Sequence, residues 1–128
     1  MSDVLAVDDD PQICAVITRW LTGWGYRVRA VDSAAAALEA MLANPAGILL
    51  CDVRMPVHTG LWLAARVRAR WPGTAIIMLT GVDDLQTVRR SRELGAVGYV
   101  TKPFNRHQLR QALDDAGAAR DASLPPRT

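Results

Sequence analysis

The residues best suited to chemistry in this sequence are carboxylates, a hydroxyl and an ammonium group that each follow an apolar run. Asp8 and Asp9 follow the first run, Asp52 ends a later one, and Thr80 and Lys102 follow two more. Clustered carboxylate oxygens can bind Mg²⁺, and one carboxylate can also act as a nucleophile. A hydroxyl and an ammonium group can contact the oxygens of a phosphoryl group. These residue types predict phosphoryl transfer, provided that the fold brings them together.

Five short segments have the composition of β-strands, and the reactive residues lie at their carboxyl ends. The segment at 47–52 is an apolar run that ends in Asp52, as expected of a strand buried on both faces. The segment at 26–31 largely alternates between apolar and polar residues, which favours an edge strand. We expect strands at residues 4–7, 26–31, 47–52, 74–80 and 96–100.

Helical segments separate these strands, and capping or breaking residues mark their ends. Pro11 suits the first turn of a helix with Asp10 as its cap, and Ser33 can cap the second helix. Asp83 or Asp84 can start the fourth helix, whose apolar positions precede a glycine. We expect helices at residues 12–21, 34–42, 61–70, 85–94 and 105–116.

Strict alternation of five strands with five helices predicts an α/β fold with a doubly wound parallel sheet. Each connection is long enough to form a right-handed helical crossover. In such sheets the functional crevice lies outside the carboxyl ends of the strands. This rule places Asp8, Asp9, Asp52, Thr80 and Lys102 around one site.

Three converging carboxylates require a counter-charge, because each pair at about 4 Å repels by roughly 4 kcal/mol at an effective dielectric constant near 20. Lys102 can supply one positive charge. Oxygen ligands on an accessible rim favour Mg²⁺ for the remainder, with Mn²⁺ as an alternative. In this arrangement Asp52 can act as the nucleophile, while Lys102 and Thr80 contact the transferred oxygens.

Composition narrows the class of protein. The net charge of +2 is too small to predict a nucleic-acid partner, and no apolar run approaches the length of about 20 residues that spans a bilayer. The first residues do not resemble a signal peptide, so we expect a cytoplasmic protein. Cys14 and Cys51 are interpreted as reduced thiols, and His58 and His107 as solvent-facing side chains without a role.

Four motifs, in this order and spacing, resemble the receiver domain of a two-component response regulator. They are Val7-Asp8-Asp9-Asp10-Pro11, Cys51-Asp52-Val53-Arg54-Met55-Pro56 followed by Gly60, Leu79-Thr80-Gly81, and Gly98-Tyr99-Val100-Thr101-Lys102-Pro103-Phe104. The resemblance covers residues 4 to about 117 and implies the strand order 2-1-3-4-5. We expect residues 1–120 to form the receiver domain and residues 121–128 to form a flexible tail.

The resemblance also implies a role for each matching residue. Asp52 would accept a phosphoryl group from the phosphohistidine of a sensor histidine kinase or phosphotransfer protein. Thr80 and Lys102 would contact the phosphoryl oxygens, and Tyr99 would change rotamer as Thr80 moves. The peptide bond before Pro103 is commonly cis in this family.

The metal ligands are likewise implied by the resemblance. Asp9 would bind Mg²⁺ directly, Asp8 largely through water, Asp52 through its carboxylate, and Arg54 through its backbone carbonyl. The sequence departs from the common pattern around this site, at His58-Thr59 and at Val82. Such neighbours, together with the side chain of Arg54, screen the phosphate from water and so affect its lifetime.

The expected function is a phosphorylation-driven switch that is not a dedicated enzyme. Phosphorylation of Asp52 would change the surface built by the fourth helix, the fifth strand and the fifth helix, which would bind a partner, an output domain or a second copy. The alternative is a phosphorylation-independent interaction module on the same scaffold. Direct DNA binding is disfavoured because too few residues follow the fifth helix to form a helix-turn-helix. A flavin protein or a phosphatase is disfavoured by the three acids after the first strand and by Arg54.

Overall fold

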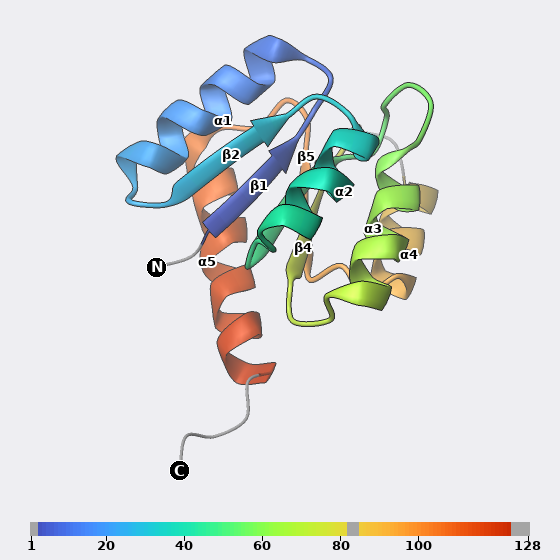
Figure 1. The fold of residues 1–128 in the computed structure, drawn as a ribbon. Helices are drawn as coiled ribbons and strands as arrows, with labels where there is room; N and C mark the ends of the chain where they lie inside the picture. Colours follow the sequence, from blue (N-terminus) through green and yellow to red (C-terminus); the bar gives the residue numbers. More distant parts are fainter. Residues whose placement is uncertain (1–2, 82–84, 124–128) are drawn as a thin grey trace.

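A computed structural model describes residues 3–81 and 85–123 and contains one parallel sheet with helices on both faces (Figure 1). The strands are β1 (Asp3–Val7), β2 (Arg27–Val31), β3 (Ile48–Asp52), β4 (Ala75–Thr80) and β5 (Gly98–Thr101). The helices are α1 (Pro11–Gly23), α2 (Ala34–Ala43), α3 (Gly60–Arg70), α4 (Leu85–Glu93) and α5 (Arg106–Ser123). The strand order β2-β1-β3-β4-β5 confirms the doubly wound α/β architecture and places β2 at an edge.

The core consists of two apolar layers, one on each face of the sheet. Successive residues of a strand point to opposite faces, so Leu5 and Val7 enter one layer while Val4 and Ala6 enter the other. Helices α2 and α3 cover the first layer, and α1 and α5 cover the second. Every residue of β3 and β4 is buried, which confirms that these apolar runs form central strands and gives their ends a rigid mount.

Side-chain caps begin the helices where the sequence predicts them. The Asp10 carboxylate accepts a hydrogen bond of 2.9 Å from the backbone N–H of Gln12, and the Ser33 hydroxyl accepts one of 3.1 Å from Ala36. Both predicted caps are confirmed. Thr59 caps α3 in the same way, a role that the sequence interpretation did not assign. The expected caps of α4, at positions 83 and 84, lie outside the described residues.

The strand β5 starts two residues later than expected, because the backbone N–H of Ala96 is used by the end of α4. That group donates to the carbonyl of Ser91 at 2.9 Å, while Gly95 adopts a positive φ of 89°. The combination is typical of a helix C-terminus that ends at a glycine. The turn comprises residues 94 and 95, and the strand begins at Gly98, although the N–H of Val97 already donates to the carbonyl of Ile76 on β4 at 2.8 Å.

Helix α5 continues beyond its expected end at Ala116, to Ser123. Alanines on either side of Gly117 favour the helix, and Arg120 anchors it by donating from Nε to the carbonyl of Gly73 at 3.2 Å. The expected domain boundary at residue 120 falls inside this helix, and residues 124–128 of the expected tail lie outside the described residues. Among the described helices, none combines the length and the apolar character needed to cross a bilayer.

Gly60 allows the loop after β3 to fold back against the strand. Its backbone N–H donates to the carbonyl of Val53 at 2.8 Å. A side chain at this position would overlap the carbonyl oxygen of Asp52, and its Cβ would lie 2.9 Å from the Asp52 carbonyl carbon. Only glycine fits here, because the neighbouring atoms are backbone and cannot rotate away.

We expect Gly60→Ala to lower the free energy of unfolding by about 1–3 kcal/mol, the usual cost of overpacking a buried site. Gly23→Ala is the matched control, since nothing lies within 4 Å of a Cβ at that helical position. The control should leave stability unchanged or slightly raised. Urea unfolding followed by circular dichroism measures both variants, and equal stability of the two would contradict the prediction.

Candidate functional site

The carboxyl ends of the central strands bring the predicted chemical groups together. Asp52 ends β3, Thr80 ends β4, and Asp8 and Lys102 directly follow β1 and β5. Strands β1, β3, β4 and β5 are consecutive neighbours in the sheet, so their ends meet along one edge. Residues separated by up to 94 positions in sequence thereby form one cluster.

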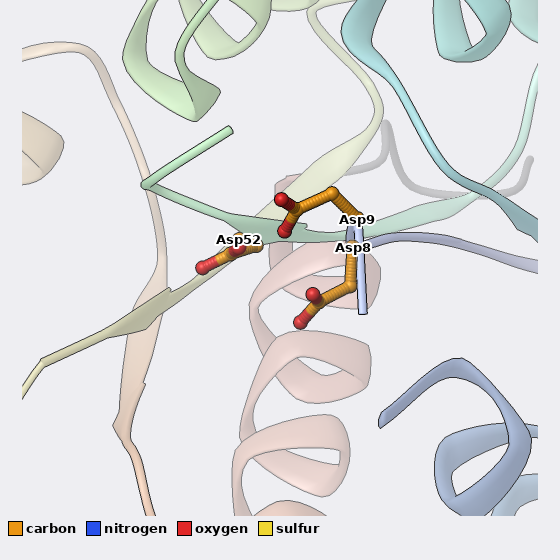
Figure 2. Close-up of side chains that lie close together, drawn as sticks. All are labelled: Asp8, Asp9 and Asp52. Atoms are coloured by element: carbon orange, nitrogen blue, oxygen red, sulfur yellow. The ribbon is translucent and has the colours of Figure 1, made fainter. Parts of the chain in front are cut away.

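The three carboxylates form the acidic half of this cluster (Figure 2). One oxygen from each of Asp8, Asp9 and Asp52 lies within 4.8 Å of the others. Asp8 and Asp52 are buried, at 1% and 5% exposure, whereas Asp9 is exposed. The cluster is therefore closed on its inner side and open to solvent at Asp9.

Lys102 supplies the positive charge at the centre of the cluster, and it is the only lysine in the sequence. Its Nζ lies 2.9 Å from an Asp8 oxygen and 3.2 Å from an Asp52 oxygen. The peptide bond that joins it to Pro103 is cis, as the resemblance implied. One ammonium group bridges two acids, which leaves the group of four side chains with an excess negative charge.

The hydroxyl of Thr80 is a buried group without a hydrogen-bond partner among the described residues. Thr80 is 1% exposed, and its Oγ1 is buried and forms no hydrogen bond with any described residue. A buried polar group in this state costs roughly 1–3 kcal/mol. Because Thr80 lies at the same sheet edge as Asp52, its hydroxyl is a donor available to an oxygen-bearing ligand.

Burial and neighbouring charge determine the protonation of the cluster. Burial raises the pKa of Asp52, the charge of Asp8 raises it further, and Lys102 only partly opposes both effects. Burial disfavours the charged form of Lys102, but its contacts with Asp8 and Asp52 outweigh this effect and raise its pKa. Lys102 therefore stays protonated, and the carboxylate of Asp52 is destabilised by its surroundings.

The donor atoms fit a hard divalent cation. Three carboxylates within 4.8 Å and one ammonium group carry an excess of two negative charges, which a divalent cation neutralises. The carboxylates offer oxygen ligands, and the open side at Asp9 leaves room for the waters that Mg²⁺ retains. The two thiols beside the cluster donate to backbone carbonyls: Cys14 to that of Asp8 at 3.2 Å and Cys51 to that of Asp52 at 3.4 Å.

Other predicted residues lie around the cluster with different surroundings. The backbone N–H of Arg54 hydrogen-bonds the Asp52 carboxylate, while the predicted use of its carbonyl as a metal ligand stays a prediction. Tyr99 lies on β5 and is 42% exposed, outside the cluster. Val82 lies outside the described residues.

His58 was interpreted as a solvent-facing side chain, and it is partly exposed but also packs on a neighbouring ring. Its ring stacks on Trp62 with a centroid distance of 3.7 Å and an interplanar angle of 7°. The signal in the sequence is the spacing of four residues, which places the loop residue over the first turn of α3. His107 is exposed, as expected.

The cleft beside the acids was not anticipated. It has a volume of about 640 Å³ and is lined by Asp8, Asp9, Cys14, Asp32 and neighbouring residues of α1, β2 and α2. Cys14 was interpreted only as a reduced thiol, yet it contacts the backbone of a cluster residue. Its position one turn into the helix that follows the acids is the available signal for this contact.

Comparison with known proteins agrees, over most of the chain, with the family resemblance of the sequence motifs. The family model described as the response regulator receiver domain matches residues 4–114. The chain is 32% identical over 129 residues to the transcriptional regulatory protein ZraR of Escherichia coli strain K12, covering 98% of the chain and 29% of that protein. The chain thus spans under a third of this relative.

Solved structures resemble the whole fold. The chemotaxis protein CheY4 of Vibrio cholerae superimposes with a TM-score of 0.85 at 31% identity, covering 91% of this chain and 98% of that one. A response regulator receiver domain protein from Clostridium thermocellum gives a TM-score of 0.90 at 25% identity, with coverages of 97% and 100%. Both likenesses extend across all five strands of the sheet.

We expect Asp52→Asn to raise the free energy of unfolding of the metal-free protein at neutral pH. Because the folded state raises the pKa of Asp52, the ionised carboxylate destabilises the fold. This penalty is complete above the folded-state pKa and disappears as the pH falls toward the unfolded value of about 3.9. Urea unfolding in EDTA between neutral pH and pH 4 should show the two proteins converging; a pH-independent difference contradicts the cause given.

We expect Thr80→Val to raise the free energy of unfolding by about 1 kcal/mol, because a methyl group replaces an unpartnered buried hydroxyl. Thr74→Val is the matched control. Thr74 is also buried, but its hydroxyl donates to the carbonyl of Ala46 at 2.7 Å, so the control should lose about 1 kcal/mol. Thermal unfolding of both variants tests the contrast, and a loss in both would show that the Thr80 hydroxyl has a partner.

Proposed function

Because this chain belongs to the response regulator receiver domain family, we propose that it is a switch whose Asp52 accepts a phosphoryl group from a sensor histidine kinase or phosphotransfer protein. Receiver domains are signalling modules rather than dedicated enzymes. The observation that carries the proposal is the cluster at the sheet edge: three carboxylates, the only lysine, and an unpartnered buried hydroxyl. A phosphoryl group would supply the oxygen that the Thr80 hydroxyl lacks.

In the proposed step, a carboxylate oxygen of Asp52 attacks the phosphorus of a phosphohistidine. A P–O bond forms as the P–N bond breaks, and the electron pair of the broken bond returns to the imidazole of the donor. Lys102, 3.2 Å from Asp52, neutralises charge on the transferred oxygens, and the Thr80 hydroxyl donates to one of them. Water later hydrolyses the acyl phosphate and returns the carboxylate.

The proposal assigns the metal to the same carboxylates. Asp8, Asp9, Asp52 and the backbone carbonyl of Arg54 would hold Mg²⁺, and the excess negative charge of the cluster supports this assignment. When bound, the ion supplies positive charge that stabilises the phosphoryl oxygens. The chain itself orients the nucleophile through the Arg54 N–H and through Lys102.

A direct backbone contact supports transmission of the signal from the site to β5. The N–H of Lys102 donates to the carbonyl of Thr80 at 2.7 Å, so movement of Thr80 toward a phosphate displaces the end of β5. Tyr99, three residues before Lys102, then changes rotamer. The surface of α4, β5 and α5 would change with it and bind a partner protein, an output region or a second copy.

The longer relatives support an output region as one destination of the signal. ZraR is named a transcriptional regulatory protein, and this chain matches less than a third of it. In the proposed function this domain receives the signal in the cytoplasm and contacts no nucleic acid itself. Its partners bind through protein surfaces.

We expect incubation with Mg²⁺ and acetyl phosphate to add one phosphoryl group to each chain, measured by intact-protein mass spectrometry. Asp52→Asn should acquire none, because the nucleophile is removed, and EDTA should prevent the reaction of the wild type. Asp32→Asn is the matched control: Asp32 lines the adjacent cleft but lies outside the carboxylate cluster, so this variant should react normally.

If Asp52→Asn still acquired the mass of a phosphoryl group, the assignment of Asp52 as the phosphoryl acceptor would be contradicted. A wild type that acquires no phosphoryl group, neither from acetyl phosphate nor from phosphorylated histidine kinases, would instead support a phosphorylation-independent interaction module. The unpartnered hydroxyl and the bridging lysine argue against that outcome.

A further inference from the structure

Helices α3 and α4 form a strongly basic face on one side of the sheet. The two helices lie side by side (Figure 1) and are in contact. Together they contain one acid, Glu93, and six exposed arginines: Arg66, Arg68, Arg70, Arg89, Arg90 and Arg92. We call these six residues the arginine face. It contrasts with the small net charge of +2 for the whole sequence.

Several of these guanidinium groups are held in place by aromatic rings. The Arg66 Cζ lies 3.8 Å from the centre of the Trp62 ring, and His58 stacks parallel to the same ring at 3.7 Å. Since two groups cannot occupy one face at these distances, Trp62 is sandwiched between them. Arg70 lies over Trp71 at 5.3 Å in a similar arrangement. The Arg66 guanidinium also donates to the backbone carbonyl of Trp62 at 3.4 Å, and its remaining in-plane N–H groups are available to a carboxylate.

Arg68 extends from α3 toward the end of α4. It donates to the carbonyl of Pro72 at 3.1 Å, at the end of α3. Its Nε also lies 2.8 Å from the position that a Cβ of Gly95 would occupy, in the turn after α4. The side chain therefore crosses the gap between the helices, and the glycine makes room for it.

Helix dipoles explain only part of this accumulation of charge. Cations in the last turn of a helix are stabilising, and Arg68, Arg70, Arg90 and Arg92 have such positions. Arg66 lies earlier in its helix, however, and stacking on Trp62 holds it there. Among the described residues, no carboxylate forms an ion pair with any member of the arginine face.

We propose that the arginine face is a docking surface for an acidic segment of a partner protein. Arginine pairs with carboxylates through two parallel hydrogen bonds, and Arg, Trp and Tyr are enriched in protein interfaces. Tyr99 and Val97 border the face at 42% and 45% exposure, and Arg92 lies over the Tyr99 ring at 5.6 Å. These groups add apolar contacts that suit a protein segment.

The size of the face favours an acidic peptide over duplex DNA. Helices of 11 and 9 residues are about 16 and 14 Å long, less than half of one DNA turn of about 34 Å. The last turns of both helices lie at the opposite end of the strands from Asp52, since each helix runs antiparallel to them. The four arginines of these last turns therefore lie away from Asp52, and the proposal does not rest on the proposed function.

The test measures binding of a fluorescein-labelled decaglutamate peptide to the whole chain at low salt by fluorescence anisotropy. The triple variant Arg66→Gln, Arg70→Gln, Arg92→Gln should bind about tenfold more weakly, as expected for three partly exposed ion pairs. The matched control is Arg19→Gln, Arg27→Gln, Arg110→Gln. It removes the same charge from exposed positions on α1, β2 and α5, including Arg110, which stacks on Trp24. The control should change the affinity less than twofold.

Three outcomes would overturn the proposal. One is the absence of peptide binding by the wild type, and another is an equal loss in both triple variants, which would reduce the effect to net charge. The third is tighter binding to a short DNA duplex or to phosphatidylserine vesicles than to the peptide, again dependent on the arginine face. Circular dichroism and acetyl phosphate labelling of each variant show that it is folded and that its Asp52 site is unaffected, so a failure here is separate from failure of the proposed function.

Discussion

Asp8 and Asp52 are buried carboxylates at the ends of neighbouring strands, and one ammonium group bridges them. Burial and the charge of Asp8 raise the pKa of Asp52, and Lys102 offsets these effects only in part. A chain free to move would separate these charges. The central strands prevent this, because every residue of β3 is buried between two apolar layers. Packing therefore holds an electrostatic arrangement that is unfavourable by itself and that the proposed cation and phosphoryl group would complete.

The same frame holds a second unfavourable group, the unpartnered hydroxyl of Thr80. It ends the other fully buried strand, β4, and its backbone carbonyl accepts from the N–H of Lys102. Thr80 and Lys102, which are both proposed to contact the phosphoryl group, are thus linked through the backbone. Local instability at this edge is tolerated because the surrounding core is large, and it makes the edge responsive to a ligand.

Charge is distributed unevenly over the molecule. Acids gather at the carboxyl ends of the strands, while arginines gather on α3 and α4, where Glu93 is the one acid. If the fold had placed these acids and arginines together, their charges would have neutralised one another. Their separation keeps one end of the domain suited to a cation and phosphate, and leaves the arginine face suited to carboxylates.

Local sequence determined which segments are helices and which are strands. Apolar runs are local patterns, and capping residues such as Asp10 and Ser33 bond to backbone groups only two or three residues away. It also identified the groups at the sheet edge, since parallel strands place their carboxyl ends together. Element ends depended on distant contacts: Arg120 anchors α5 to Gly73, and the end of α4 uses the N–H of Ala96. Only the tertiary structure decided that Lys102 bridges two acids, that the Thr80 hydroxyl is unpartnered and that His58 stacks on Trp62. These are distances and contacts between side chains, and they depend on how the elements pack in space.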